Sequence, residues 1–149
     1  MDRQNKNQLI LEQAIGFNVN RTAYLMSEEI GRRFRAHGYP LSAQDFGILH
    51  LLWKNKDLTQ MEIAARMMRN KTTITRRLNG LENKGLLYRT PSPRDRRYFL
   101  INLTDKGNTA VSALSPLVAE FQQEVSSDVS DEDKTITLNT LKKIIAKLS

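Results

Sequence analysis

The sequence contains no cysteine. This absence excludes disulfide bonds, thiol-based redox sensing and zinc sites built from cysteine. No run of apolar residues approaches the roughly 20 that a membrane-spanning helix requires. The first residues, MDRQNKNQ, are polar and show no apolar segment of a secretory signal, so we expect a cytoplasmic protein.

Little in the sequence points to catalysis or to a bound metal. Its two histidines are His37, in a stretch that ends a predicted helix, and His50, on the apolar face of another. Without cysteine, a metal site would need both histidines together with carboxylates. No Ser-His-Asp order, glycine-rich phosphate loop or convergent carboxylate pair stands out. We therefore expect no enzymatic activity and no metal or other cofactor.

Acidic residues are scarce in the middle of the chain. Residues 41–106 hold 13 of the 23 Lys and Arg but only 6 of the 16 Asp and Glu, which leaves ten of each elsewhere. The whole net charge of +7 therefore lies in this segment of the 149-residue chain. A localised basic excess is typical of a protein that binds nucleic acid, although a solvated charged surface is the alternative.

Apolar spacing predicts a long helix over residues 9–36, which the sequence His-Gly-Tyr-Pro at 37–40 ends. Ser42 and Asp45 have the spacing of a capping box, in which each side chain bonds to the other residue's backbone N–H. They predict a second helix that runs to about Lys54, with an apolar face.

A second pair of short helices follows. Thr59 and Glu62 form another capping-box pattern, which opens a helix that ends near Met67. After a short break, Asn70 caps the next helix, and Gly85 supplies the residue that favours a left-handed backbone at its end. Two short helices joined by such a turn form a helix-turn-helix.

The hydrophobic period changes after Gly85. Residues 86–89 and 98–103 are predicted strands, and the basic, proline-containing segment 90–97 joins them into a hairpin. A hairpin behind a helix-turn-helix is a winged helix. We thus predict a mainly α protein with a small β-hairpin wing.

Two further helices follow the predicted wing, and the termini carry strong apolar stripes. The expected organisation is a DNA-binding core over residues 41–106, flanked within one continuous domain by dimerisation helices in 1–40 and 107–149. The terminal stripes need a surface to cover them, and a second copy of the chain is the simplest supply.

The helix after Asn70 has an unusual composition. RNKTTITRRL, from Arg69 to Leu78, holds four basic residues, three threonines and no acid, although threonine is a mediocre helix former. Hydroxyls and arginine suit contacts to phosphates and base edges, and a helix N-terminus suits a phosphate. The alternative is a solvated helix that happens to lack acids. The predicted DNA-contacting residues of this recognition helix are Asn70, Lys71, Thr72, Thr73, Thr75, Arg76 and Arg77.

The predicted hairpin tip holds Arg94, Asp95, Arg96 and Arg97. Arginines on a narrow tip fit the electronegative minor groove of DNA. An acid is unusual in a DNA-facing loop. We expect Asp95 either to orient a neighbouring arginine through a bidentate salt bridge or to cap the turn. An ordinary charged hairpin is the alternative.

Two stretches, LTQMEIAARMMRNKTTITRRLNGLENKGLLYR and PSPRDRRYFLINLTDKG, resemble the MarR family of bacterial winged-helix regulators. The wing signature, Asp-Arg-Arg followed by a strand and Leu-Thr-x-x-Gly, carries most of the likeness. One departure is Ser92-Pro93, where the family often has Asp-Pro. The resemblance implies a homodimer with intertwined terminal helices that binds a pseudo-palindromic operator. It also implies repression that a small, phenolic or anionic effector relieves.

Two points stay open at the level of sequence. Tyr24, His50 and Trp53 are candidates for lining an effector pocket, but the pattern favours plain core. The second point is the function itself. The alternative to an operator-binding regulator is a winged-helix interaction module whose basic face docks a protein or binds RNA.

Overall fold

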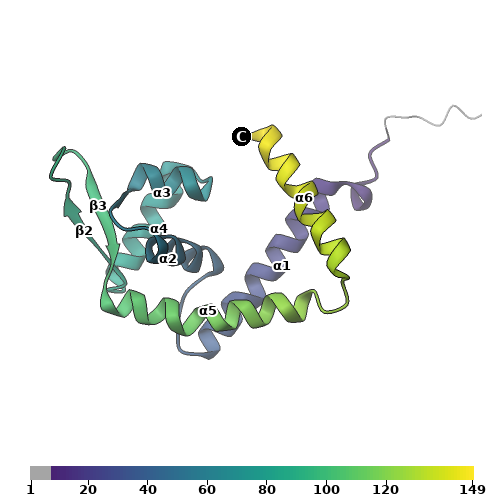
Figure 1. Ribbon diagram of the computed structural model, residues 1–149, viewed down its shortest axis with the longest axis horizontal. Helices are drawn as coiled ribbons and strands as arrows, with labels where there is room; N and C mark the ends of the chain where they lie inside the picture. The colour runs from purple at the N-terminus through teal and green to yellow at the C-terminus, as the bar shows by residue number, and fades with distance from the viewer. Residues whose placement is uncertain (1–7) are drawn as a thin grey trace, which may run out of the picture. The chain divides into compact units, whose positions relative to one another are not determined.

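The computed structural model describes residues 8–149 and is mainly helical, with one small antiparallel sheet (Figure 1). The described part of the chain divides into two compact units, one ending at Leu114 and one from Ser115 to Ser149. The winged-helix prediction is confirmed. The elements, in chain order, are η1 (Leu11–Gln13), α1 (Ile15–Ala36), α2 (Ala43–Lys54), β1 (Leu58–Thr59), α3 (Gln60–Met67), α4 (Lys71–Asn83), β2 (Leu87–Pro91), β3 (Phe99–Leu103), α5 (Asp105–Val125) and α6 (Asp131–Leu148).

The predicted caps determine where the short helices begin. Ser42 Oγ accepts a bond from Asp45 N, and the Asp45 carboxylate accepts one from Ser42 N, both at 3.0 Å. Thr59 and Glu62 form the same reciprocal box at the start of α3. Because each box satisfies two backbone donors that a helix start leaves unpaired, it fixes the first turn.

The prediction of one helix over residues 9–36 is wrong at its start. A 3₁₀ turn over Leu11–Gln13 comes first, and Ala14 is extended, with φ −78° and ψ 129°. Asn18 explains the break, since its Nδ2 donates to the carbonyls of Glu12 and Ala14, each at 2.9 Å. These bonds hold the preceding turn apart from the helix, so α1 begins at Ile15.

The sheet has the strand order β1-β3-β2. Of the two strands of the predicted hairpin, β3 is central and β2 lies at one edge. Leu87 pairs with Leu103 at the base of the hairpin, and Leu58 of the short strand β1 pairs with Ile101. Asp57 and Asn102 secure this edge, because each donates one hydrogen bond to the other's side chain, at 2.9 and 2.8 Å. The link between α2 and α3 is thereby fixed to the wing.

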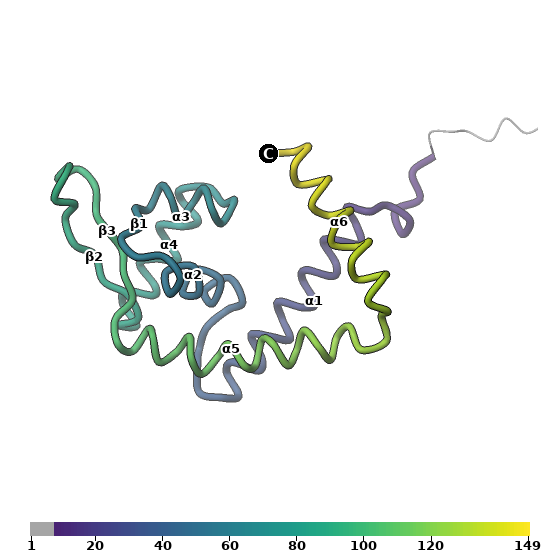
Figure 2. The backbone as a smooth tube through the Cα atoms, viewed as in Figure 1, coloured from purple at the N-terminus to yellow at the C-terminus, as the bar shows by residue number. Residues whose placement is uncertain are grey.

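The core of the first unit lies where α2, α3 and α4 gather beside the hairpin (Figure 2). Its largest buried side chains come from these elements and from α1 and α5, and no polar or charged residue among the described ones is buried. The fully buried members include Phe34, Ile48, Leu49, Ile63, Ile74, Leu78, Leu81, Leu87, Ile101 and Leu114. This core holds α4 and the wing together as one body.

The second unit comprises the C-terminal part of α5 and the whole of α6. Ser130 caps α6 by accepting a bond from Asp133 N at 3.1 Å. Leu138, Ile145 and Leu148 recur along α6 and remain exposed. Among the described residues, no helix combines the length and apolar character needed to cross a membrane.

Candidate nucleic-acid interface

One face of α4 is buried and the opposite face is open. Ile74, Leu78 and Leu81 are each at most 1% exposed, as the helical spacing predicts. The Asn70 side chain caps the helix by accepting a bond from Thr73 N at 2.8 Å. The core therefore fixes the rotation of α4 about its axis, and this rotation decides which polar residues face outward.

The outward face presents Thr72 and Arg76, both exposed. Within the described residues, Arg76 has no ion pair or hydrogen bond through its guanidinium. Lys71 is also exposed, at the first position of the helix. This face therefore offers free cations and a hydroxyl, which is the chemistry that phosphates and guanine edges accept.

Two of the predicted contact residues are engaged within the protein instead. Thr75 Oγ1 donates to the Lys71 carbonyl at 2.8 Å and accepts a hydrogen bond from Gln60. Arg77 Nη1 lies 3.3 Å from Asp45 Oδ1 and 3.1 Å from Ser42 Oγ. These residues tie α4 to α3 and to the cap of α2. The long-range bonds leave no signal in local spacing, so the sequence alone does not separate these two residues from those that contact DNA.

The wing tip contains the expected Asp95 interactions, and both suggested roles are present. The Asp95 carboxylate accepts a bond from Arg97 N at 3.0 Å, which closes the turn. It also pairs with the Arg97 guanidinium, with Nη2 to Oδ2 at 2.7 Å and Nε to Oδ1 at 3.1 Å. The Arg97 side chain lowers the pKa of Asp95, the backbone N–H lowers it further, and the pair raises the pKa of Arg97.

The remaining wing arginines are free. Arg94 and Arg96 are exposed, and neither side chain has an ion pair or hydrogen bond within the described residues. Arg97 is 82% exposed while paired, and its guanidinium lies 5.8 Å from the centre of the Tyr98 ring. The tip thus presents one arginine oriented by its ion pair beside two unpaired ones among the described residues.

Sequence reasoning missed the connection between the wing and the recognition helix. Arg89 of β2 donates from Nη2 to Asn79 Oδ1 at 3.0 Å and pairs with Glu82, both on α4. The Arg89 side chain is 21% exposed. Nothing in the local pattern of residues 86–89 identifies this partner, because the bond spans two different elements. It fixes the wing's base against the C-terminal half of α4.

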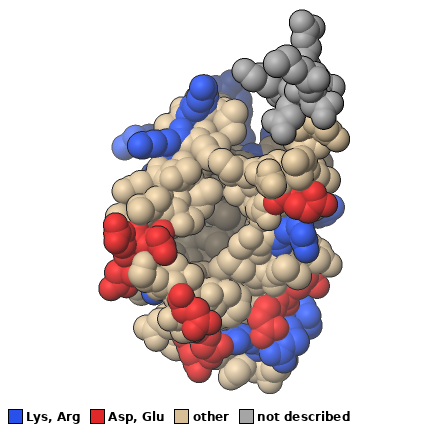
Figure 3. Space-filling model, turned by 90° about the vertical axis from the view of Figure 1, so that its right-hand side faces the viewer, with Lys and Arg blue, Asp and Glu red and all other residues tan. Residues whose placement is uncertain are grey.

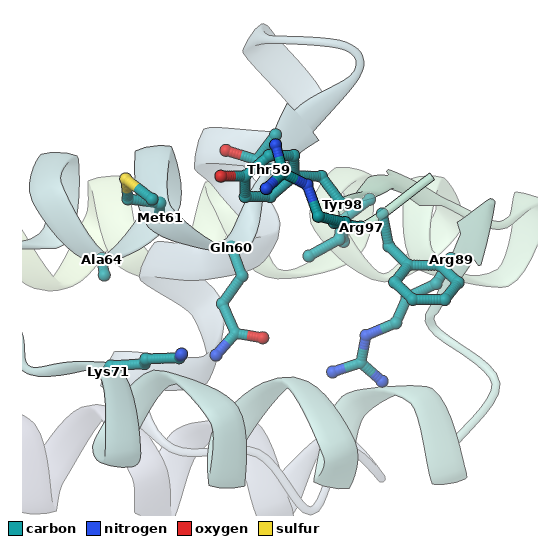
Figure 4. A pocket seen from close by; sticks show the side chains of 10 residues that line it. Thr59, Gln60, Met61, Ala64, Lys71, Arg89, Arg97 and Tyr98 are labelled. Atoms are coloured by element: carbon teal, nitrogen blue, oxygen red, sulfur yellow. The ribbon is translucent and has the colours of Figure 1, made fainter. Parts of the chain in front are cut away.

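A cavity of about 290 Å³ lies between α3, α4 and the wing (Figure 4). Figure 4 shows Gln60 and Arg89 reaching toward the same helix, with Lys71 at its start. The cavity combines an apolar surface with cationic side chains. The apolar members include Met61, Phe99 and Ile101, and the cationic members are Lys71, Arg89 and Arg97.

The three candidate effector residues do not surround one cavity within the described chain. Tyr24 lines a space of about 330 Å³ beside α1, and Trp53 lines a separate one of about 180 Å³. His50 borders neither, although its ring centre lies 5.8 Å from that of Trp53. Tyr24 is 63% and Trp53 52% exposed, so neither is core in this chain.

Within residues 8–149, neither histidine belongs to a cluster that could hold a metal. His37 Nδ1 lies 3.0 Å from the Arg33 carbonyl at the end of α1. In the part of the chain that the structure describes, no group of three or more His, Cys, Asp or Glu is placed to hold a metal.

The face of the molecule shown in Figure 3 carries acidic as well as basic side chains.

Sequence and structure comparisons relate this chain to known transcriptional regulators. The sequence model of the MarR family matches residues 41–99. The regulator PecS of Dickeya dadantii is 32% identical over 120 residues, covering 78% of this chain and 71% of PecS. A Thauera aromatica protein named for regulation of the hcr operon is 30% identical, and the match spans 60% of its length and 66% of this chain. The repressor CouR, solved on a 23-mer DNA duplex, is 27% identical with a TM-score of 0.82, covering 91% of this chain and 94% of CouR.

Proposed function

Because this chain belongs to the MarR family of DNA-binding transcriptional regulators, we propose that it represses genes by binding a pseudo-palindromic operator as a homodimer. The family assignment replaces the alternative of a protein- or RNA-docking module. The observation that carries the proposal is the open face of α4, where Arg76 is exposed and has no acidic partner among the described residues.

The exposed residues divide the operator contact between two grooves. Thr72 and Arg76 face outward from α4, which suits the major groove, where arginine binds guanine through two hydrogen bonds. Asn70, Lys71 and the helix N-terminus suit a phosphate. Arg94, Arg96 and the oriented Arg97 suit the minor groove beside it.

Three of the contact residues named from sequence take a different or shared role in this proposal. Thr75 and Arg77 position α4 through their bonds to Gln60 and Asp45. Thr73 is partly buried, and its backbone N–H is used by the Asn70 cap.

A homodimer is supported by apolar side chains left exposed near both termini. They include Leu9, Ile10, Leu11, Ile15, Val19, Leu138, Ile145 and Leu148. Such a surface on one chain is typical of a buried contact with a second copy. Two recognition helices in one dimer would reach half-sites about one helical turn, roughly 34 Å, apart.

The proposed effector is a small anion with an aromatic or phenolic ring. The cavity between α3, α4 and the wing supports this class, because Lys71, Arg89 and Arg97 supply positive charge beside the apolar Phe99 and Ile101. Tyr24, His50 and Trp53 remain proposed effector contacts at separate places, and Tyr24 and Trp53 are exposed and open to completion by a partner chain.

Substitution of Arg76 tests the operator contact. Arg76→Ala should remove about 1–3 kcal/mol of discrimination at one base pair in each half-site, because a bidentate contact to guanine is lost. The measurement is a set of dissociation constants for operator duplexes with single base changes. Lys54→Ala removes the same charge from the exposed end of α2 and should leave the base preference intact. Unchanged preference in the Arg76 variant would contradict the proposed role.

A further inference from the structure

We propose that Arg89 locks the side-chain amide of Asn79 as a hydrogen-bond donor, so that Asn79 selects a base with a major-groove carbonyl, guanine or thymine. This inference rests on the proposed placement of α4 in the major groove. It adds a specificity-determining residue that is not among the contact residues predicted from the sequence.

Asn79 belongs to the outward stripe of α4. Thr72, Arg76 and Asn79 follow one another at intervals of four and three residues, which places them on one helical face. All three are exposed. Asn79 therefore lies on the same face as the free cation Arg76, one turn closer to the wing.

The bond from Arg89 decides which end of the Asn79 amide faces outward. A guanidinium has five N–H donors and no acceptor, so the atom of Asn79 that meets it must be the oxygen. The structure places Arg89 Nη2 3.0 Å from Asn79 Oδ1. The Asn79 Nδ2 amino group has no partner within the described residues and remains available as a donor.

Glu82 strengthens this arrangement. Arg89 pairs with Glu82 through Nη1 while it contacts Asn79 through Nη2, so two residues on successive turns of α4 hold one guanidinium. The Arg89 side chain is only 21% exposed and emerges from a strand paired in the sheet. Glu82 and the paired strand therefore fix the Arg89 guanidinium. The Asn79 amide cannot turn without losing its bond to Arg89.

The fixed orientation has a direct consequence for base recognition. An asparagine that reads adenine uses its oxygen and its nitrogen together, to the N6 amino group and N7. In this chain Arg89 occupies the oxygen. The remaining donor matches guanine O6 and N7 and thymine O4. Adenine offers it only N7, next to an amino group that opposes it, and cytosine offers no major-groove acceptor.

The test compares variants on duplexes that carry each of the four bases at every position of an operator half-site. The wild-type protein should favour guanine or thymine over adenine or cytosine at one position by about five- to tenfold, the scale of one base-edge hydrogen bond. Asn79→Ala should reduce this preference to less than about twofold. Asn79→Asp keeps an oxygen toward Arg89 but presents a second oxygen outward, so the preference should invert toward adenine or cytosine.

Two variants of the locking residues complete the design. Arg89→Gln should admit adenine at the same position, because the Asn79 amide can then turn. Glu82→Gln leaves the Arg89–Asn79 bond in place and should retain the wild-type preference. Circular dichroism of each variant checks that the helices are intact.

The outcomes separate this inference from the proposed function. If Asn79→Ala leaves every base preference unchanged while Arg76→Ala relaxes the preference at one position, only the role of Asn79 is overturned. Equal weakening on all sequences by Asn79→Ala would also overturn it, since that result means a phosphate contact. If Arg76→Ala changes no preference either, the placement of α4 in the major groove fails first.

Discussion

At the scale of single residues, Gly107 shows how closely two elements approach. A Cβ added there would lie 2.0 Å from the Leu86 carbonyl oxygen, far inside a normal contact. The same carbonyl accepts a hydrogen bond from Thr104 N at 3.1 Å, and Gly107 N donates to Thr104 Oγ1. The Leu-Thr-x-x-Gly pattern thus allows the backbone at the start of α5 to pack closely against the residue that precedes β2.

Gly107→Ala should lower the free energy of unfolding by about 1–3 kcal/mol or more, because backbone must move to admit the methyl group. Gly80→Ala is the matched control, since nothing lies within 4 Å of its Cβ position. That change, inside α4, should raise the free energy by about 0.5–1 kcal/mol through helix propensity. Urea unfolding at one protein concentration measures both, and equal effects would contradict the close approach.

Asp95 gives a prediction about pH. Its pKa lies below the ordinary 3.8, first because of the Arg97 side chain and then because of the Arg97 backbone N–H. A lowered pKa means that the pairing stabilises the wing turn above pH 3.8 and is lost as the pH falls through the lower value.

In an NMR titration of the Asp95 carboxyl carbon, the midpoint should therefore fall below 3.8 in the wild-type protein. Arg97→Gln should move it upward, toward the ordinary value, whereas Arg94→Gln should leave it in place because Arg94 does not contact the carboxylate. If the Asp95 midpoint is the same in the wild-type protein and in Arg97→Gln, the Asp95–Arg97 pair does not form in solution.

At the scale of elements, the helix-turn-helix and the wing were largely predictable from sequence. Capping boxes at Ser42 and Thr59, the Asn70 cap and Gly85 are local signals, and the structure confirms each of them. Strand β1 was not predicted, since two residues carry no period and its partner Ile101 lies far along the chain.

The candidate site was predictable only where its residues act alone. Arg76 and the wing arginines are exposed as expected, and Asp95 pairs with its near neighbour Arg97. Arg77 and Arg89 differ, because each bonds to a residue on another element. Sequence spacing gives the face of a helix but not the tertiary partner that a long side chain reaches.

Arg77 and Arg76 should therefore respond differently to substitution. Arg77→Met breaks the contact to Asp45 and should lower the free energy of unfolding by about 1 kcal/mol, as expected for a partly exposed ion pair. Its affinity for DNA should fall on all sequences alike, with base preference retained. Urea unfolding and operator titrations test this, and a changed preference at one base pair would restore Arg77 as a direct contact.

At the scale of the whole molecule, the two ends of the chain and its middle differ in net charge and in exposed apolar side chains. Residues 41–106 carry the entire net charge, and the exposed apolar residues recur in α1 and α6. Along α6, Leu138, Ile145 and Leu148 fall at helical intervals on one side. We attribute operator binding to the first region and dimer formation to the second.

A dimer predicts stability that depends on protein concentration, because association favours the folded state by mass action. The unfolding temperature should rise as the protein is concentrated, and sedimentation should give twice the mass of one chain. Ile145→Asp should shift both toward a monomer. Asn139→Asp adds the same charge on another side of α6 and should not, so equal effects of the two changes would contradict a contact through the apolar stripe.

The central claim is that α4 and the wing read a specific sequence in duplex DNA. The most direct measurement is selection of bound fragments from sheared genomic DNA at low and at moderate salt. We predict recovery of one or a few palindromic sites that persist as salt rises, since base contacts survive where phosphate contacts weaken. Recovery of all fragments at low salt and none at moderate salt would contradict the claim, because it would mean binding through phosphates alone.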